Sequence, residues 1–292
     1  MISIVIPARN EAPVIARNLR ALTTGAAVDE IDVVVVCNAC TDDTAGVARS
    51  FGPPVRVIET EVGGKAHALN LGDQAAVAFP RVYVDADVTI SLNSIRALAA
   101  RLELGDVLAV APRALVDLNG CSWCVRAYYD IRSRLPTARE GIGGSGVYAL
   151  AHAGRRRFGE FPNLTADDGY VRIQFSARER ETLAHASSTV FAPRRLRDLV
   201  LVRTRARYGT IELERRCPDL RRNMGERNHK SIVSLLRLPS LWPKVLVYSL
   251  VNIVARLRVA ARLSTASLRW ERDNTSRDVA TLAPDLPGKN SL

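Results

Sequence analysis

The stretch IDVVVVCNACTDDTAGVARSF (residues 31–51) shows how the first part of the chain is built. Its first six residues form a largely β-branched apolar run, which is typical of a strand buried on both faces. The Thr and two Asp residues at 41–43 favour the first turn of a helix. We therefore predict a strand that leads directly into a helix, with polar side chains at the junction.

The same alternation extends outward from this stretch. Predicted strands lie at 2–6, 31–36, 55–59 and 81–84, and predicted helices at 11–22, 41–51 and 63–79. Strands and helices that alternate in this way predict an α/β fold with a mostly parallel, doubly wound sheet, which binds ligands at the carboxyl ends of its strands.

After Ala111 the alternation stops. We predict helices at 121–134 and 166–178, a glycine-rich loop at 136–146 and a short strand at 147–150. The chain from Pro193 to about Trp270 is predicted to be helical. It forms a helical C-terminal extension to the α/β domain.

Charge is unevenly distributed along the 292 residues, whose formal net charge is +11. Residues 1–193 have a net charge of −1, residues 194–272 of +13, and residues 273–292 of −1. A basic excess suits nucleic acid, an anionic membrane surface or a phosphate-rich substrate. Since the excess lies outside the α/β part, it does not describe the predicted ligand site.

Two carboxylates follow the strand predicted at 81–84. Asp85 and Asp87 stand two residues apart in VYVDADV (82–88), so both can reach one cation. Carboxylate oxygens suit Mg²⁺ or Mn²⁺, and such ions bridge carboxylates to a diphosphate. For this pair alone, a solvated turn at a strand end is an equal alternative.

Five short segments occur in order at the ends of successive elements: SIVIPARNE (3–11), CNACTDDT (37–44), GGKAHALN (63–70), DAD (85–87) and ADD (166–168). This series resembles the pattern of glycosyltransferase family 2, which reads IPxxNE, D-x-S-x-D-x-T, G-K-A-x-A-x-N, D-x-D and E-D on a GT-A fold. The resemblance covers about residues 2–210. It implies a GT-A-like sheet flanked by helices and an enzyme that uses a nucleoside-diphosphate sugar.

The resemblance also implies a donor site. Pro7, Arg9 and Glu11 would line the base and ribose site, where Asn38 replaces the usual acidic residue. That replacement leaves uridine and guanosine donors both open. Lys65 would meet the donor diphosphate.

The same resemblance divides the carboxylates between metal and base. Asp85 would face the ribose or base, and Asp87 with Asp85 would hold Mn²⁺ or Mg²⁺. Asp168 would be the general base that takes the proton of the acceptor hydroxyl, with Asp167 in support. Alternatively, both residues of this second pair simply favour a helix N-terminus.

Two further segments are assigned by the resemblance. Gly144 and Ser145 in GIGGSG (141–146) would contact the acceptor and the donor sugar. RTRARYG (203–209) stands in the place of a Q/R-x-x-R-W element, where Arg207 would clamp the diphosphate. Thr204 departs from that element, which favours transfer of a single sugar. A solvated basic helix face is the alternative for Arg207.

The segment LPSLWPKVLVYSLVNIVARLRVAARL (238–263) combines apolar and basic residues. Its longest uncharged stretch, Val245 to Ala255, is too short for a membrane-spanning helix. The composition suits a helix on an anionic membrane surface, and packing on the domain or on a second subunit is the alternative. We predict a catalytic domain at 1–210, a basic extension at 211–272 and a flexible tail at 273–292.

Two other classes of protein are weighed against an enzyme of this kind. A nucleic-acid-binding protein fits the charge, but no recognition motif accompanies the arginines, so we expect no nucleic-acid partner. A thiol redox protein fits the C-x-x-C pair Cys37/Cys40, and a zinc site from that pair and Cys121/Cys124 is disfavoured by their distance in sequence. The odd cysteine count and the absence of a leader pattern predict a cytoplasmic location, in part at the inner face of the membrane.

Overall fold

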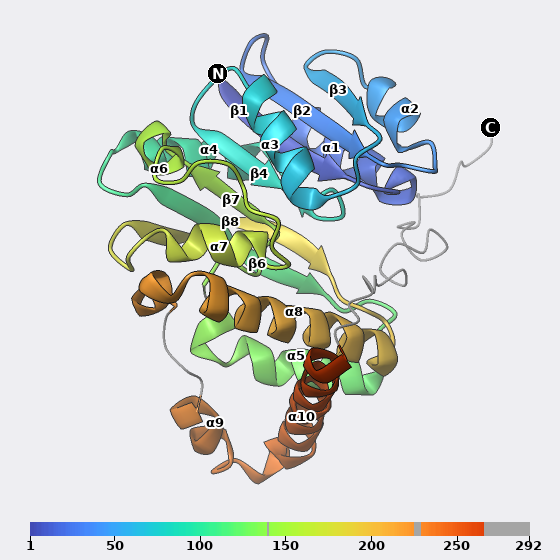
Figure 1. Ribbon diagram of the computed structural model, residues 1–292, viewed down its shortest axis with the longest axis vertical. Coiled ribbons are helices and arrows are strands. Elements are labelled where there is room, and N and C mark those ends of the chain that lie inside the picture. The colour runs from blue at the N-terminus through green and yellow to red at the C-terminus, as the bar shows by residue number, and fades with distance from the viewer. Residues whose placement is uncertain (139, 225–228, 266–292) are drawn as a thin grey trace, which may run out of the picture.

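The computed structural model describes residues 1–138, 140–224 and 229–265. Within them the chain forms one eight-stranded sheet with helices on both faces (Figure 1). The strands are β1 Ile2–Ala8, β2 Ile31–Asn38, β3 Val55–Thr60, β4 Arg81–Val84, β5 Thr89–Ile90, β6 Ala109–Asp117, β7 Val147–Leu150 and β8 Arg180–Phe191. The α-helices are α1 Ala12–Thr23, α2 Thr44–Arg49, α3 Lys65–Ala75, α4 Leu92–Glu103, α5 Trp123–Ser133, α6 His152–Arg155, α7 Asp167–Ile173, α8 Leu196–Arg216, α9 His229–Leu235 and α10 Trp242–Thr265.

The sheet is mostly parallel, as the sequence predicted. Its strand order is β3-β2-β1-β4-β7-β6-β8-β5. The first four strands in that order are parallel to one another, and β8 is parallel to β6. Strand β7 runs antiparallel between β4 and β6, and β5 runs antiparallel to β8.

Side chains that alternate along β1 fill a core on each face of the sheet. Ile4 and Ile6 pack with α1 and α4, and Val5 packs with Leu69 of α3 on the other face. All three of these strand residues are completely buried. This two-sided burial explains why the strands read as continuous apolar runs.

Three strands, β5, β6 and β8, were not predicted from the sequence, and β5 is only two residues long. Strand β6 contains Pro112, and its register with β8 shifts between Pro112 and Arg113. A proline cannot donate to the ladder and is confined to irregular positions of a sheet. Strand β8 reads RETLAHASSTVF, in which small and polar residues hide the strand period.

The predicted helical region after Pro193 is divided. It contains α8, a 3₁₀ helix at Pro218–Asn223, α9, a 3₁₀ turn at Pro239–Leu241 and α10. The domain boundary expected at residue 210 falls inside α8, which continues to Arg216. The tail at 273–292 lies outside the described residues. Helix α10 packs across α5 and α8, on the side of α8 away from the sheet (Figure 1).

Candidate active site

The candidate site lies where the direction of strand addition reverses. The chain builds from β1 outward to β3 and then returns to β4 on the other side of β1. Ligands of open α/β sheets bind at such a switch point. A pocket is found there, with Pro7 from the end of β1 and Asp85 from the end of β4 in its wall.

The glycine loop closes this pocket because β7 is antiparallel to β4. The N–H of Asp85 donates to the carbonyl of Gly146, with an N···O distance of 2.8 Å. Gly146 has φ +65° and lies against Val88, so a side chain there would be both strained and crowded. Gly143 and Gly146 both line the pocket.

Lys65 links the two acidic motifs across the pocket. Its Nζ lies 2.7 Å from Oδ1 of Asp85 and 3.0 Å from Oδ2 of Asp167. It is the first residue of α3 and follows Gly64, whose φ of +154° is a conformation that L side chains rarely adopt. The glycines of GGKAHALN therefore bring the lysine to the end of β4.

Negative charge exceeds positive charge in this pocket. Burial raises the pKa of Asp85, and the charges of Asp167 and Asp87 raise it further against the effect of Lys65. Burial also raises the pKa of Asp167, with Asp168 adding to the effect. Burial lowers the pKa of Lys65, but the neighbouring carboxylates outweigh it and raise the pKa above its ordinary value. A second cation would therefore be stabilised here.

The ADD segment presents its two carboxylates differently. Asp167 begins α7, is 7% exposed and is paired with Lys65. Asp168 is partly exposed and lines the pocket, and its Oδ1 accepts the N–H of Gly169 at 2.7 Å. Both residues line the pocket, and Asp168 is the more exposed of the two.

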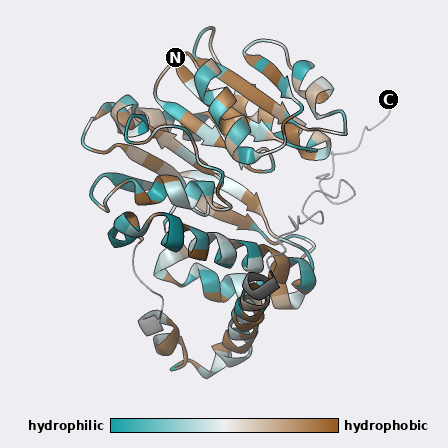
Figure 2. Cartoon of the chain, in the orientation of Figure 1, coloured by the Kyte–Doolittle hydropathy of each residue, from teal (hydrophilic) through white to brown (hydrophobic). Residues whose placement is uncertain are grey.

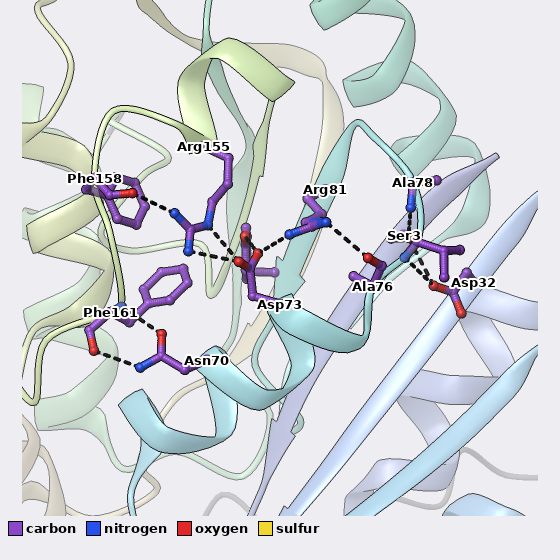
Figure 3. Close-up of polar contacts among 12 residues, drawn as sticks. Ser3, Asp32, Asn70, Asp73, Ala76, Ala78, Arg81, Arg155, Phe158 and Phe161 are labelled. Carbon is purple, nitrogen blue, oxygen red and sulfur yellow. Dashed lines mark hydrogen bonds and ion pairs between the residues drawn. The ribbon is translucent and has the colours of Figure 1, made fainter.

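A polar network anchors the loop that leads to α7 (Figure 3). The amide of Asn70 in α3 accepts the N–H of Phe161 at 2.7 Å and donates to its carbonyl at 3.1 Å. One turn further along α3, Asp73 pairs with Arg81 and with Arg155 of α6. Asn70, the last residue of GGKAHALN, thus fixes the backbone of this loop, a role that its sequence motif did not predict.

Helix α8 holds α7 from the other side through small residues. A Cβ placed on Gly209 of α8 would lie 2.8 Å from the Cβ of Ala166, the residue before α7. Oε2 of Glu212 accepts the N–H of Thr165 at 2.8 Å. The ADD segment is therefore fixed by both α3 and α8.

Tyr148 is a pocket residue that sequence reasoning missed. It lies in β7, stacks on Tyr83 with 4.9 Å between ring centroids, and lines the pocket. Within the described structure its buried hydroxyl has no hydrogen-bond partner. Burial raises the pKa of Tyr148, with the site carboxylates adding to the effect, so this phenol stays a hydrogen-bond donor. No motif could reveal it, because only the strand pairing brings it to the pocket.

The residues expected at the nucleotide base lie along the ends of β1 and β2. Arg9 is exposed beside Gly63, and Glu11 is buried with its N–H bonded to Oγ1 of Thr44. The buried amide of Asn38 donates to the carbonyl of Ala8 and accepts the N–H of Gly64. Asn38 therefore shapes the turn before Lys65.

Four of the other expected residues are not part of the pocket lining: Asp87, Gly144, Ser145 and Arg207. Ser145 is completely buried, and its hydroxyl contacts the carbonyls of Gly141 and Val147. This burial corrects the expectation that Ser145 touches substrate. Gly144 is exposed but is not in the pocket wall, and Arg207 lies in α8 outside that wall.

The chemistry of the donor set fits a divalent cation. Asp85 and Asp87 offer carboxylate oxygens, and both side chains are partly exposed. The backbone carbonyl of Asp87 accepts a hydrogen bond from Arg17, which fixes the turn. Among the described residues no three His, Cys, Asp or Glu side chains form a complete metal site. A bound diphosphate would have to complete the ligand set.

The C-x-x-C pair at the end of β2 lacks the features of a reactive dithiol. Cys37 is 2% exposed, and burial raises its pKa to about 12. Reactive cysteines are accessible and have a lowered pKa. The five cysteines are free thiols.

Comparison with known families gives a match to the first half of the chain. The model of the family described as Glycosyl transferase family 2 matches residues 3–157. Curated relatives from Staphylococcus aureus are named 4,4'-diaponeurosporenoate glycosyltransferase. The relative from strain MRSA252 is 36% identical over 108 residues, which are 35% of this chain and 28% of the relative. The chain thus spans about a quarter of the length of these relatives.

Solved structures share the fold at lower identity. A mannosyltransferase from Pyrobaculum calidifontis, solved with GDP-Man and Mn²⁺, matches with a TM-score of 0.56 and 21% identity, over 91% of this chain and 76% of its own. Glucosyl-3-phosphoglycerate synthase from Mycobacterium tuberculosis, solved with Mn²⁺, UDP and phosphoglyceric acid, matches with a TM-score of 0.54 and 18% identity, over 74% and 78%.

Proposed function

Because this chain belongs to glycosyl transferase family 2, we propose that it transfers a single sugar from a nucleoside-diphosphate sugar to a hydroxyl acceptor. The observation that carries the proposal is the meeting of Lys65, Asp85, Asp167 and Asp168 in one pocket at the carboxyl ends of β1 and β4. These groups come from three separate motifs. Their convergence supplies both positive and negative charge where a donor diphosphate would lie.

The donor would bind along the ends of β1 and β2. Pro7, Arg9 and Glu11 would border the nucleoside, and Asn38 would hold the turn that presents Lys65. The ammonium group of Lys65 would exchange a carboxylate partner for the diphosphate. Asp85 and Asp87 would hold Mn²⁺ or Mg²⁺, which stabilises the charge of the leaving diphosphate when bound. Arg207 is proposed as an additional contact to that diphosphate.

Transfer would proceed in one displacement with inversion. Asp168 would take the proton of the acceptor hydroxyl as the oxygen bonds to the anomeric carbon. The bond from that carbon to the diphosphate oxygen breaks, and the diphosphate leaves with the electron pair. Asp167 would keep Lys65 in place. The hydroxyl of Tyr148 would donate to an oxygen of the bound sugar, since it has no partner among the described residues.

Similar folds were solved with GDP-Man and with UDP-glucose, so both nucleotides are candidates. We propose an acceptor on a lipid-linked or cell-envelope glycan. The exposed apolar residues of α10 suit an acceptor that is presented at a membrane.

A thermal-shift panel of UDP, GDP, CDP and dTDP with Mn²⁺ tests the donor site. One nucleotide should raise the melting temperature, because binding to the folded state adds about 2.7 kcal/mol at a concentration a hundredfold above Kd. Asp87→Ala should remove the part of the shift that needs Mn²⁺, and Asp219→Ala, at an exposed carboxylate of the 3₁₀ helix after α8, should keep it. The proposal fails if no nucleotide shifts the wild-type protein.

A further inference from the structure

Helix α10 uses one face for internal packing. Its 24 residues make it about 36 Å long. Val245, Val251, Ala255 and Val259 are buried to within 2–6% exposure. They face α5 and α8, where Val251 joins Tyr128 and Leu199 in one apolar cluster. This face of α10 therefore shows the packing on the rest of the chain that was the alternative interpretation of this segment.

The opposite face of α10 carries a row of large apolar side chains that remain 40–65% exposed. We call this row the α10 stripe: Trp242, Leu246, Leu250, Ile253, Val254 and Leu257. At about 100° per residue these positions fall within one third of the helix circumference. The stripe extends for about 23 Å along the helix axis. Figure 2 shows the hydrophobic colour running along α10.

The apolar surface continues beyond the helix. Leu236 and Leu238, just before α10, are about half exposed, and the indole N–H of Trp242 donates to the carbonyl of Leu236 at 2.9 Å. This bond holds the preceding segment against the first turn of the stripe. Soluble monomers rarely expose continuous apolar areas of this kind without a partner.

The sequence segment that carries the stripe has charges of one sign only. Between Glu226 and Glu271 the sequence contains no acidic residue. Basic residues in the same segment include Arg237, Arg256 and Arg258. By helical spacing, Arg256 and Arg258 lie on either side of the stripe, and Arg256 is exposed.

We propose that the α10 stripe docks on an anionic lipid surface, with the helix lying in the plane of the interface. Apolar side chains would enter the boundary of the acyl chains while the flanking arginines meet lipid phosphates. A second copy of the chain is the weaker occupant, because pairing two stripes would bring like charges together without an acidic residue of this segment to offset them. Among the described residues no helix is long and apolar enough to cross a membrane.

Sedimentation with lipid vesicles tests this proposal. The full chain should bind vesicles of phosphatidylcholine with phosphatidylglycerol and bind pure phosphatidylcholine much less. Leu246→Ser/Leu250→Ser/Leu257→Ser should lower the partition coefficient by roughly a hundredfold, since each leucine loses its apolar transfer. Val28→Ser/Val77→Ser/Leu104→Ser, which changes three exposed apolar residues elsewhere, should keep wild-type binding.

Two further readouts separate this proposal from its alternatives. The nucleotide-induced thermal shift should be the same in the leucine variant, so a failure of lipid binding is distinct from a failure of the donor site. Light scattering after size exclusion gives the oligomeric state. A wild-type dimer that the leucine variant converts to monomer, together with no vesicle binding, would overturn the proposal in favour of a second copy.

Discussion

At the scale of single residues, Lys65 is the centre of the site. It pairs with one carboxylate from each of two acidic motifs, and the pKa values of both carboxyls are nevertheless raised. Removing the ammonium group would leave the nearly buried Asp167 without its counter-charge. A buried charge that loses its partner is much more costly than an exposed one.

We predict that Lys65→Met destabilises the metal-free protein by about 1–3 kcal/mol at pH 7.5, because it leaves Asp167 without its partner. The charge of Lys65 lowers the pKa of Asp85 and of Asp167 against the effect of burial, so removing Lys65 should raise both carboxyl pKa values further in the variant. A folded state that binds protons more tightly than the unfolded state gains stability as the pH falls. The difference in free energy of unfolding between the wild type and the variant should therefore become smaller between pH 7.5 and pH 5. Urea unfolding at each pH measures it.

The matched variant is Arg96→Met, because Arg96 pairs with Glu30 on the surface. The hydrogen bond from Arg96 holds the pKa of Glu30 at about 2. The stability from this pair is present above the ordinary glutamate pKa and is lost only as the pH falls toward 2. The small loss of unfolding free energy in Arg96→Met should therefore be the same at pH 7.5 and at pH 5. If the stability loss of Lys65→Met depended on pH no more than that of Arg96→Met, the pairing of Lys65 with the two carboxylates would be contradicted.

At the scale of elements, α3 connects the two halves of the site. Its first residue, Lys65, reaches the pocket, while Asn70 and Asp73 hold the loop and helix that precede α7. Burial raises the pKa of Asp73, but hydrogen bonds from Tyr83, Arg81 and Arg155 outweigh this effect and leave the pKa below its ordinary value. Asp73 therefore stays charged and keeps both arginines in place.

Asn70→Ala should separate positioning from donor binding. It leaves the N–H and carbonyl of Phe161 without partners, at a cost of about 1–3 kcal/mol. The displaced ADD segment should lower turnover by about tenfold or more. The Kd for the nucleotide should hardly change, because β1 and β4 are untouched. Asn93→Ala, at an exposed position of α4, is the control. Loss of nucleotide affinity in parallel with turnover would argue against this role of α3.

Five of the residues that the sequence analysis singled out line the pocket, namely Pro7, Lys65, Asp85, Asp167 and Asp168, and the roles expected of them stay predictions. Asp85, Asp167 and Asp168 could be placed because each follows or begins an element within an ordered series of motifs. Tyr148 stacks on Tyr83, which lies 65 residues earlier in the chain, and Asn70 bonds to Phe161, which lies 91 residues later. Local sequence patterns do not encode contacts between such distant residues. Ser145 was misplaced because a glycine-rich motif does not tell which of its residues faces inward.

At the scale of the whole molecule, the basic excess and the candidate site lie in different parts of the chain. The part of the chain that builds the pocket is near neutral, and the basic excess lies from α8 onward. Helices α9 and α10 lie at the end of the molecule farthest from β2 and β3 (Figure 1). A basic, apolar end could therefore rest on a surface without covering the strand ends at which the nucleoside is expected.

The most direct test of the account is the release of nucleoside diphosphate from the donor that the panel selects, with Mn²⁺ present and water as acceptor. Asp168→Asn should lower the release rate by about 10²–10⁴-fold, since the general base is lost. It should leave the nucleotide Kd unchanged. Asp198→Asn, in the first turn of α8, should release at the wild-type rate. A wild-type rate in Asp168→Asn would contradict the account.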